Sequence, residues 1–597
     1  MNFFKLNKYI FALAFAGTLT LSSCGDDFLG KDPQGALTPE ALANAQGVDL
    51  LTTSAYAALS TPVDGKDPYQ ASPFNWVWGS IYGGDANKGS DPGDQSTVNE
   101  IELYNTMSTN GYLDQKWAWI YMTNKRVNLA LQTIDLAEDL SDAVRTRRTA
   151  ELKFIRALAY FEGMRVFGRT GCPYVDESHT ENNPMVPNGV DISENVLKDV
   201  DAAIAGLPEV LTDDEDPDKG QIGRANVWAA KALKAKILMY LNRQSEAKPI
   251  IAEVLSSGVN SGGIALGLED KIYDNFNALT ENGKESIFSI QYSAADENNA
   301  QAVLTLCYPH NSGPGGCCGF FQPSYELANS FQVDENGLPY LNGEYRTKPS
   351  VSYRNTDPTG VLALNTDAAV DPRLDLAIGR YGVPYKDWGE PKNDWVRNPV
   401  NGGIFLPKKF VLSSAEKDQG MYRMYGGWAP GSAMNIQYLN VRDLTLLYAE
   451  CLANDGQLAD AMEQVNKIRR RAALEVNITT KSDGTPAANY KISEYPSSHA
   501  AFSNKETCLK AIRMERKLEL AMEGERWFDL VRWGGDYMAQ ELKAYVDYEK
   551  QYISKFAGAS YLPASKTMLP VPDNEILTMG TNPETGQPYL VQPEAWR

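Results

Sequence analysis

The sequence lacks the signatures of the common enzyme classes. Its three histidines, His179, His310 and His499, lie far apart. No HExxH, GxSxG, Walker or GxGxxG pattern occurs, which excludes the zinc-protease, serine-hydrolase and nucleotide-binding classes that these patterns mark. A glycosidase is not excluded. Such an enzyme needs only two carboxylates at a set separation in space, and the chain has 76 acidic residues.

Cysteines are few, and none has metal-site spacing. There are seven, with no paired CxxC motif. Apart from Cys24, we predict buried thiols rather than metal ligands, because a free cysteine behaves as a small apolar residue. These are Cys172, Cys307, Cys451 and Cys508, with the adjacent pair Cys317 and Cys318, whose disulfide state the sequence leaves open.

An acidic run, Asp213 to Gly220, is the one segment that could attract calcium, but its glycine is misplaced for an EF-hand loop. We interpret it as a solvated acidic turn. No cofactor is predicted, although a structural calcium ion remains possible.

Positive charge is scarce. The 56 basic residues against 76 acidic ones give a net charge of −20. Nucleic acids and anionic lipids are bound through Lys and Arg, so neither is expected as a partner. A neutral or cationic ligand fits this composition better.

Long apolar runs are also missing. The most apolar stretch, from Tyr9 to Leu21, follows Lys5 and Lys8 and is too short to span a membrane. It ends in Leu21-Ser22-Ser23-Cys24, which resembles a bacterial lipobox. We therefore predict a lipoprotein signal peptide over residues 1–23 and a lipid on Cys24. Asp26 and Asp27 resemble a signal for the outer cell surface, and the periplasm-facing leaflet is the alternative.

Helical periodicity is present in two blocks, and the blocks repeat. Apolar spacing predicts a helix over 149–168, a helical pair over 225–242 and 245–255, and a second pair over 442–453 and 458–471. Ala235, Leu238, Asn242, Ala247 and Ile251 have the same spacing as Ala449, Leu452, Gly456, Ala461 and Val465. This pattern resembles the tetratricopeptide helical hairpin. Two unrelated hairpins are the alternative.

Between the blocks the chain is irregular. Residues 285–292 alternate apolar and polar residues as a short strand does. From His310 to about Trp428 the chain is rich in Gly, Pro, Asn, Tyr and Trp. Because its aromatic content argues against disorder, we interpret this segment as functional loops.

Aromatic and amide side chains cluster in two of the loops, residues 74–87 and 308–321. Aromatic rings can pack against the apolar face of a sugar, while Asp and Asn satisfy its hydroxyls. The alternative is that these rings pack in the core. The candidate ligand-binding residues are Trp76, Trp78, Asp85, Asn87, Tyr308, Phe320 and Phe321.

Several motifs resemble those of the SusD/RagB family. They occur in order along the chain: ELKFIRALAYF at 151–161 with RVFG at 165–168, RDLTLLYAE at 442–450 with RRRA at 469–472, ERKLEL at 515–520, GERWFDLVRWG at 524–534 and LPVPDNEI at 569–576. The Glu-Arg-Trp run is expected to be an amphipathic helix with buried rings and ions paired at its rim, not an active site.

The resemblance implies a fold and a function. The fold is mainly α, with tetratricopeptide-like hairpins as a scaffold, long irregular loops and a few short strands. It would form one SusD-like domain over 24–597, with an N-terminal helical half to about residue 280 and a C-terminal half over 281–597 that carries the ligand-face loops. The two candidate loops match the regions where family members contact sugars.

By the same resemblance, the protein is a non-catalytic, lipid-anchored lipoprotein of the outer membrane that faces the cell exterior. It would capture an oligosaccharide and deliver it to a SusC-type TonB-dependent transporter. The alternatives are a peptide-binding member of the family, a surface glycosidase, or an assembly scaffold without a small ligand. The glycan itself is not identified by the sequence.

Overall fold

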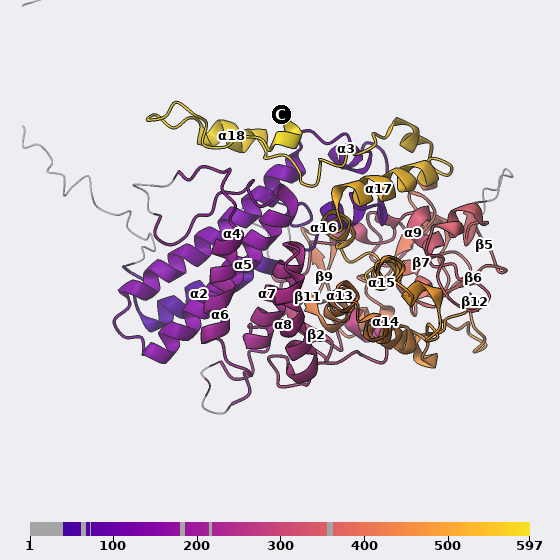
Figure 1. Ribbon diagram of the computed structural model, residues 1–597, viewed down its shortest axis with the longest axis horizontal. Coiled ribbons are helices and arrows are strands. Elements are labelled where there is room, and N and C mark those ends of the chain that lie inside the picture. Colours follow the sequence, from indigo (N-terminus) through magenta and orange to yellow (C-terminus); the bar gives the residue numbers. More distant parts are fainter. Residues whose placement is uncertain are drawn as a thin grey trace, which may run out of the picture.

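The computed structural model describes residues 40–60, 67–71, 73–179, 185–213, 216, 218–354 and 362–597. Over these residues helices dominate, and the strands are short (Figure 1). The predicted fold class, mainly α with helical hairpins and long irregular segments, is confirmed. The predicted signal peptide and Cys24 lie outside the described residues.

The helices fall into an N-terminal and a C-terminal group, joined by irregular chain with short helices. The first group is α2 (Ala45–Ser60), α3 (Thr97–Glu102), α4 (Gly111–Leu136), α5 (Asp142–Phe167), α6 (Ser193–Gly206), α7 (Val227–Tyr240) and α8 (Gln244–Ser257). The short ones are α9 (Tyr325–Ser330), α10 (Arg373–Ala377), α11 (Pro399–Gly402) and α12 (Ser414–Asp418). The last are α13 (Val441–Asn454), α14 (Leu458–Ala472), α15 (Lys505–Glu519), α16 (Arg526–Arg532), α17 (Gly535–Glu549) and α18 (Asp573–Met579).

The long helices form one continuous array. α2 and α5 pack against α4, and α6, α7 and α8 follow in order; α8 then packs against α13, which contacts both α14 and α15 (Figure 1). Helix α5 is longer than predicted because it begins at Asp142, where the Ser141 hydroxyl accepts the Val144 N–H. Its centre is buried on all sides: Ala157, Leu158 and Ala159 are each 0% exposed.

The two predicted helical pairs are confirmed, and their repeat positions share the same burial. The four apolar repeat positions in the α7–α8 hairpin and their four counterparts in the α13–α14 hairpin are all buried. The turn positions also match, since Asn242 (φ 58°) and Gly456 (φ 78°) both have left-handed backbone. The equivalence extends to the helix starts, where Asn226 and Asn440 each accept a backbone N–H three residues on at 2.9 Å.

The two hairpins stack on each other although almost two hundred residues separate them. Lys248 on α8 forms an ion pair with Asp455 at 2.5 Å, and the Cys451 thiol lies 3.4 Å from the Met239 sulfur. A hairpin of this kind cannot bury both of its faces alone, so each completes the core of the other.

The strands pair two by two and form no large sheet in the described part of the chain. Antiparallel pairs are β1 (Ala86–Gly89) with β3 (Phe320–Pro323), β2 (Ser286–Ile290) with β11 (Ile436–Asn440), β4 (Ser352–Arg354) with β5 (Leu362–Leu364), β7 (Ile378–Gly379) with β8 (Leu406–Pro407), and β9 (Tyr422–Tyr425) with β10 (Ala429–Ser432). β6 (Ala369–Val370) pairs with β12 (Asn489–Tyr490) in parallel. β2 is the strand predicted over 285–292.

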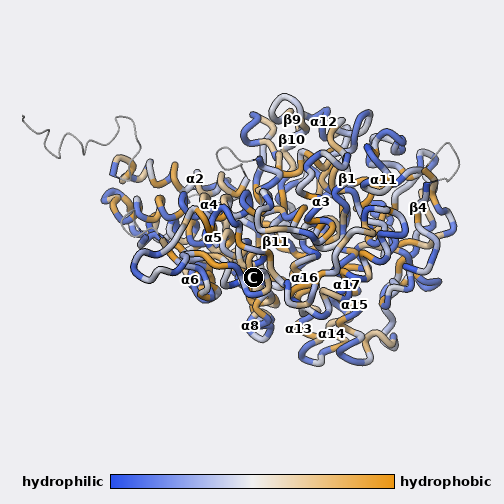
Figure 2. The backbone as a smooth tube through the Cα atoms, turned by 90° about the horizontal axis from the view of Figure 1, so that it is seen from above, coloured by the Kyte–Doolittle hydropathy of each residue, from blue (hydrophilic) through white to orange (hydrophobic). Residues whose placement is uncertain are grey.

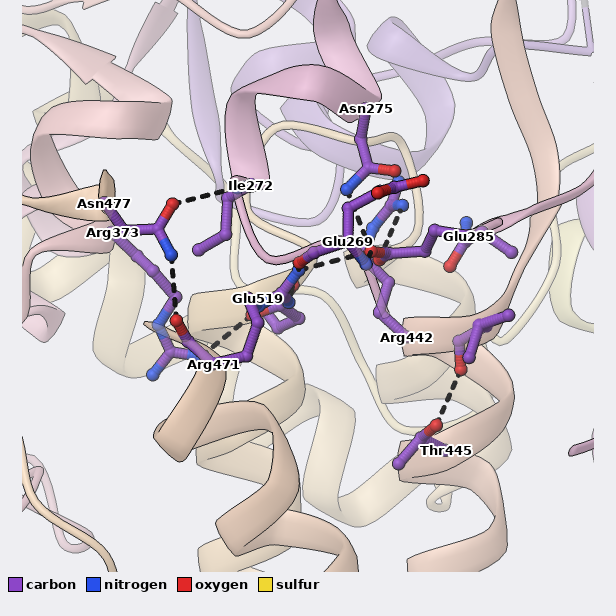
Figure 3. A network of polar contacts seen from close by, with 12 residues as sticks. Glu269, Ile272, Asn275, Glu285, Arg373, Arg442, Thr445, Arg471, Asn477 and Glu519 are labelled. Atoms are coloured by element: carbon purple, nitrogen blue, oxygen red, sulfur yellow. Dashed lines mark hydrogen bonds and ion pairs between the residues drawn. The ribbon is translucent and has the colours of Figure 1, made fainter. Parts of the chain in front are cut away.

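Buried ion pairs connect the strands to the late helices. Glu285, beside β2, contacts Arg442 on α13 at 3.2 Å and Arg471 on α14 at 3.3 Å. Arg471 also pairs with Glu519 on α15, which in turn contacts Arg373 on α10 at 3.0 Å (Figure 3). Each of these five side chains is at most 4% exposed. Such pairs depend on their geometry, because removal of one partner leaves a buried charge unpaired.

The Glu-Arg-Trp run, residues 525–527 of the 524–534 motif, lies deeper in the fold than expected. Its rings are buried as predicted, with Trp527 at 0% exposure. The ions of the motif are paired, as predicted, but lie deeper than a rim: Arg526 is 8% exposed and Asp529 is 5% exposed, and Asp529 pairs with Arg516 of α15 at 2.8 Å. The ion pair between Arg516 and Asp529 thus connects α15 to α16 inside the fold.

One large cluster of buried apolar residues runs from Val48 to Leu590 and includes residues of both halves. The boundary near residue 280 stays a prediction.

Candidate ligand-binding face

The two predicted aromatic loops do meet in space, but inside the protein. Trp76 lies in a π-helical turn, Trp76–Ile81, and is 1% exposed. Its indole N–H donates to the Tyr69 carbonyl at 2.7 Å. Its ring meets Phe320 edge-on at 6.4 Å and Phe321 at 5.9 Å between centroids. These rings hold β1 and β3 against the turn.

The other four candidates are buried as well. Trp78, Asp85 and Tyr308 are each 2% exposed and Asn87 is 0% exposed. The Asn87 side chain accepts the Tyr545 hydroxyl at 3.0 Å and donates to Glu549 at 3.2 Å. Burial raises the pKa of Asp85 to about 6. All seven predicted residues thus belong to the core rather than to an exposed ligand face.

An exposed aromatic surface lies instead on the β9–β10 hairpin. Trp428, at its turn, is 52% exposed, and Tyr422 and Tyr425 are partly exposed. The turn residues Gly426 (φ 59°) and Gly427 (φ 70°) both have left-handed backbone, as tight hairpin turns require. A Cβ at Gly426 would lie 2.8 Å from the Trp428 indole nitrogen, so glycine lets that ring fold back over the turn.

Two carboxylates border this surface. Glu297 accepts the Gly426 N–H at 2.5 Å. Burial, with the charges of Asp67 and Glu297 nearby, raises the pKa of Tyr425. We call the surface formed by Asp67, Glu297, Tyr422, Tyr425 and Trp428 the aromatic face.

The aromatic face and the helical hairpins lie on opposite sides of the molecule. Figure 2 shows β9, β10 and α12 along one edge, and α13 and α14 along the opposite edge. A ligand on the aromatic face would leave the helical edge free.

Two carboxyl groups that are not part of the aromatic face have strongly raised pKa values. Burial raises the pKa of Glu549 to about 8 and that of Glu281 to about 8. Glu549 is 0% exposed and accepts the Glu326 N–H at 2.7 Å. Glu281 accepts the Asn435 N–H. Both groups are engaged with backbone inside the fold.

The described part of the acidic run is only partly the solvated turn that was expected: Asp213, Lys219 and Gly220 are exposed. Asp218 is 1% exposed and accepts two hydrogen bonds from Arg148, at 2.6 and 2.9 Å. Asp216 pairs with Arg147 at 2.6 Å. Within the described residues, no three His, Cys, Asp or Glu side chains gather as a metal site would require.

The family model for the SusD family matches residues 284–582. The chain belongs to the SusD family. A SusD-like protein of Bacteroides ovatus is 23% identical over 562 residues, which cover 89% of this chain and 83% of that protein. SusD-like protein P38 of Formosa agariphila is 26% identical over 432 residues, covering 70% and 71%.

Solved structures share the fold of this SusD-family protein. A SusD superfamily protein from Bacteroides vulgatus superposes with a TM-score of 0.63 at 18% identity, covering 92% of this chain and 99% of that one. Surface glycan-binding protein A from Bacteroides thetaiotaomicron, solved in complex with laminarihexaose, gives a TM-score of 0.60 at 18% identity, covering 92% and 99%. At these identities the likeness concerns the fold.

The SusD-family chain carries a disulfide beside the aromatic face. Cys317 and Cys318 are bonded to each other, and the glycine turn before them packs on β10: a Cβ at Gly315 would lie 3.2 Å from the Pro430 side chain. The thiols of Cys172, Cys307, Cys451 and Cys508 are free and buried, as predicted.

Sequence reasoning missed Trp428 although a signal was available. The run Tyr422-Arg423-Met424-Tyr425-Gly426-Gly427-Trp428 places three rings around a double glycine, which favours a hairpin turn. The denser aromatic runs at 74–87 and 308–321 were the candidates instead, and their candidate rings lie in the core.

Proposed function

We propose that this protein is a non-catalytic glycan-binding lipoprotein of the cell surface that captures an oligosaccharide for a SusC-type TonB-dependent transporter. The observation that carries the proposal is the exposed Trp428 ring on the aromatic face. Membership of the SusD family supports it, as does the shared fold with a surface glycan-binding protein solved with laminarihexaose.

The chemistry of the aromatic face suits a sugar. The flat indole can cover the apolar C–H face of a pyranose ring. The carboxylates of Asp67 and Glu297 are exposed and can accept hydrogen bonds from sugar hydroxyls, which otherwise resist leaving water. No positive side chain is needed for a neutral sugar, in keeping with the net charge of −20.

Attachment to the membrane would be through lipid at Cys24. No helix in the described residues has the length and apolar character needed to cross a bilayer. Several acyl chains, at about 0.8 kcal/mol per buried methylene, hold an N-terminus at a membrane without a spanning helix. Asp26 and Asp27 next to the lipid favour the outer face.

Delivery to a transporter needs a second surface. The helical edge formed by α8, α13 and α14 lies opposite the aromatic face (Figure 2), so a transporter bound there would leave the sugar site open. We propose that this edge contacts the SusC-type partner. Copurification of the transporter should be lost when exposed side chains on α8 and α14 are replaced, and copurification unchanged by such replacements would refute this step.

The decisive experiment is calorimetry of the protein with a panel of oligosaccharides that begins with laminarihexaose, alongside a peptide panel. Saturable binding to a glycan, with no release of reducing sugar on incubation, would support the proposal. Peptide binding alone would favour the peptide-binding alternative. Release of reducing sugar would favour a glycosidase that uses carboxylates of the aromatic face. Transporter binding without any small ligand would favour a scaffold.

A further inference from the structure

One cavity, separate from the aromatic face, is lined by many positively charged side chains. It is lined by residues of α15 and α17, has a volume of about 490 Å³, and falls within the range of small-molecule sites. We call it the arginine cavity. Its lining has five basic side chains and two acidic ones, in a chain whose net charge is −20. The basic residues are Arg346, Lys510, Arg513, Lys517 and Arg526.

The sequence places three of these cations on one stripe. Lys510, Arg513 and Lys517 recur at spacings of three and four along α15, so they share a helix face. The facing residues of α17 are Tyr537 and Glu541. The cavity is therefore bounded on two sides by α15 and α17, and the irregular segment 341–346 and Arg526 of α16 complete its lining.

The carboxylates present do not use up this charge. Glu326 accepts hydrogen bonds from both Arg346 (2.7 Å) and Lys517 (3.0 Å). Glu541 is shared by Arg526 at 3.4 Å and Arg346 at 3.9 Å, distances too long for strong hydrogen bonds. Two carboxylates thus serve three cations, and Glu506 pairs with Lys510 at 3.4 Å, before Arg513 is counted.

Arg513 is the lining cation that forms no ion pair with a carboxylate of the described residues, although its side chain hydrogen-bonds with Tyr537. Its guanidinium lies over the rings of Tyr537 at 4.3 Å and Trp533 at 5.1 Å. Its buried Nε makes no hydrogen bond with the described residues. Because the two rings fix the plane of the guanidinium, its donors are oriented before any ligand arrives.

The lowered pKa of the neighbouring Lys517 is consistent with an excess of positive charge in the cavity. Burial lowers the pKa of Lys517, and the charges of Arg526 and Arg346 lower it further, against the opposite effect of Glu326. A negative group entering the cavity would relieve this repulsion among like charges.

We propose that the arginine cavity binds a small ligand that carries an oxyanion: a carboxylate, a sulfate or a phosphate. Arg513 and Arg526 would hold the anion through charge-assisted hydrogen bonds. Gln540 and Asn342, which also line the cavity, can bond to hydroxyl groups of an organic ligand. The proposal does not rest on glycan binding at the aromatic face.

The test is calorimetry of the mature protein in detergent micelles at low ionic strength, with glucuronate, inorganic sulfate, inorganic phosphate and neutral glucose as probes. One site should bind at least one of the three anions, and glucose should not bind there. Arg513→Gln should weaken the anion about tenfold. Arg470→Gln is the matched control, since Arg470 on α14 is half exposed and paired with Glu494 at 2.7 Å.

The relative affinities identify the source of the anion. Glucuronate binding tighter than sulfate and phosphate would indicate a sugar acid, and the reverse order would indicate a free inorganic anion; either supports the site. Absence of binding by all three anions would overturn the proposal.

A second variant covers the case in which Arg513→Gln does not fold. Lys510, whose side chain is 41% exposed at the rim, can be changed to Gln without disturbing the core, and this variant should also weaken the anion. Crystals soaked in selenate should show an anomalous peak beside Arg513. Unchanged affinity in the variants that fold, or selenate peaks only elsewhere, would overturn the proposal.

Discussion

Asn242 and Gly456 occupy the same position in two helical hairpins, and both have left-handed backbone (φ 58° and 78°). Each ends the first helix of its hairpin and allows the second to fold back. Asn and Gly are the residues that adopt this conformation most readily, because other side chains clash with the following carbonyl.

This equivalence predicts how Gly456 can be replaced. No atom lies within 4 Å of a Cβ placed there, so the cost of Gly456→Ala is conformational, about 1 kcal/mol in the free energy of unfolding. Gly456→Asn should be close to neutral, as its counterpart already shows. Thermal unfolding of the two variants checks this. Equal loss of stability in both would contradict the repeat.

Trp76→Ala should destabilise the protein rather than weaken ligand binding alone. Its ring is 1% exposed, and truncation of a buried tryptophan costs about 3–5 kcal/mol. The measurement is chemical unfolding followed by circular dichroism, with Trp76→Phe as a milder change. A variant with wild-type stability and lost glycan affinity would restore the sequence-based role of this residue.

Trp428→Ala should behave in the opposite way. Because the ring is half exposed, its loss should leave the melting temperature unchanged while weakening the glycan, by about tenfold if the ring covers one sugar. Tyr561→Ala is the matched control, since the Tyr561 ring is 51% exposed and its hydroxyl donates a hydrogen bond to Asp547 on α17. If both variants bind as the wild type does, the aromatic face is not the site.

The titration of Glu281 should lower the stability of the protein as the pH rises from about 5 to 8. The pKa of Glu281 is raised from 4.5 to about 8 in the folded protein. Between these values the folded state keeps a proton that the unfolded state has released, so the free energy of unfolding decreases as pH increases. Glu549, also raised to about 8, acts in the same direction.

Glu281→Gln isolates one of these groups. The amide oxygen can still accept the Asn435 N–H, but the side chain no longer titrates. Its melting temperature, measured by calorimetry from pH 5 to 8, should decline less than that of the wild type. Glu584→Gln, at an exposed position, should follow the wild-type curve. A decline in Glu281→Gln parallel to the wild type would exclude Glu281 as a cause.

The helical scaffold could be predicted from the sequence because the residue spacings that define it lie within single helices and hairpins. Spacings of three to five residues already identify which faces of α7, α8, α13 and α14 are buried, and a repeat of those spacings confirms the assignment. The family motifs add the order of the elements. Even so, the ions of Arg526 and Asp529 were expected at the rim of their helix, since a charge pattern does not reveal a partner from another helix, such as Arg516 for Asp529.

The ligand face could not be predicted in the same way. Trp76 and Trp428 both stand in aromatic runs with glycine nearby, yet one is in the core and the other is half exposed. The difference arises from contacts across more than two hundred residues, such as Trp76 with Phe320 and Phe321. Such long-range contacts cannot be inferred from composition or from residue spacing.

The stacking of α8 on α13 has a consequence for synthesis and turnover. The surface that the early hairpin presents around Met239 is covered only when residues 441–454 have been made and folded against it. A chain that stops earlier would expose this apolar surface to proteases and chaperones. The chain must therefore reach about residue 454 of its 597 residues before the apolar surface of the α7–α8 hairpin can be covered.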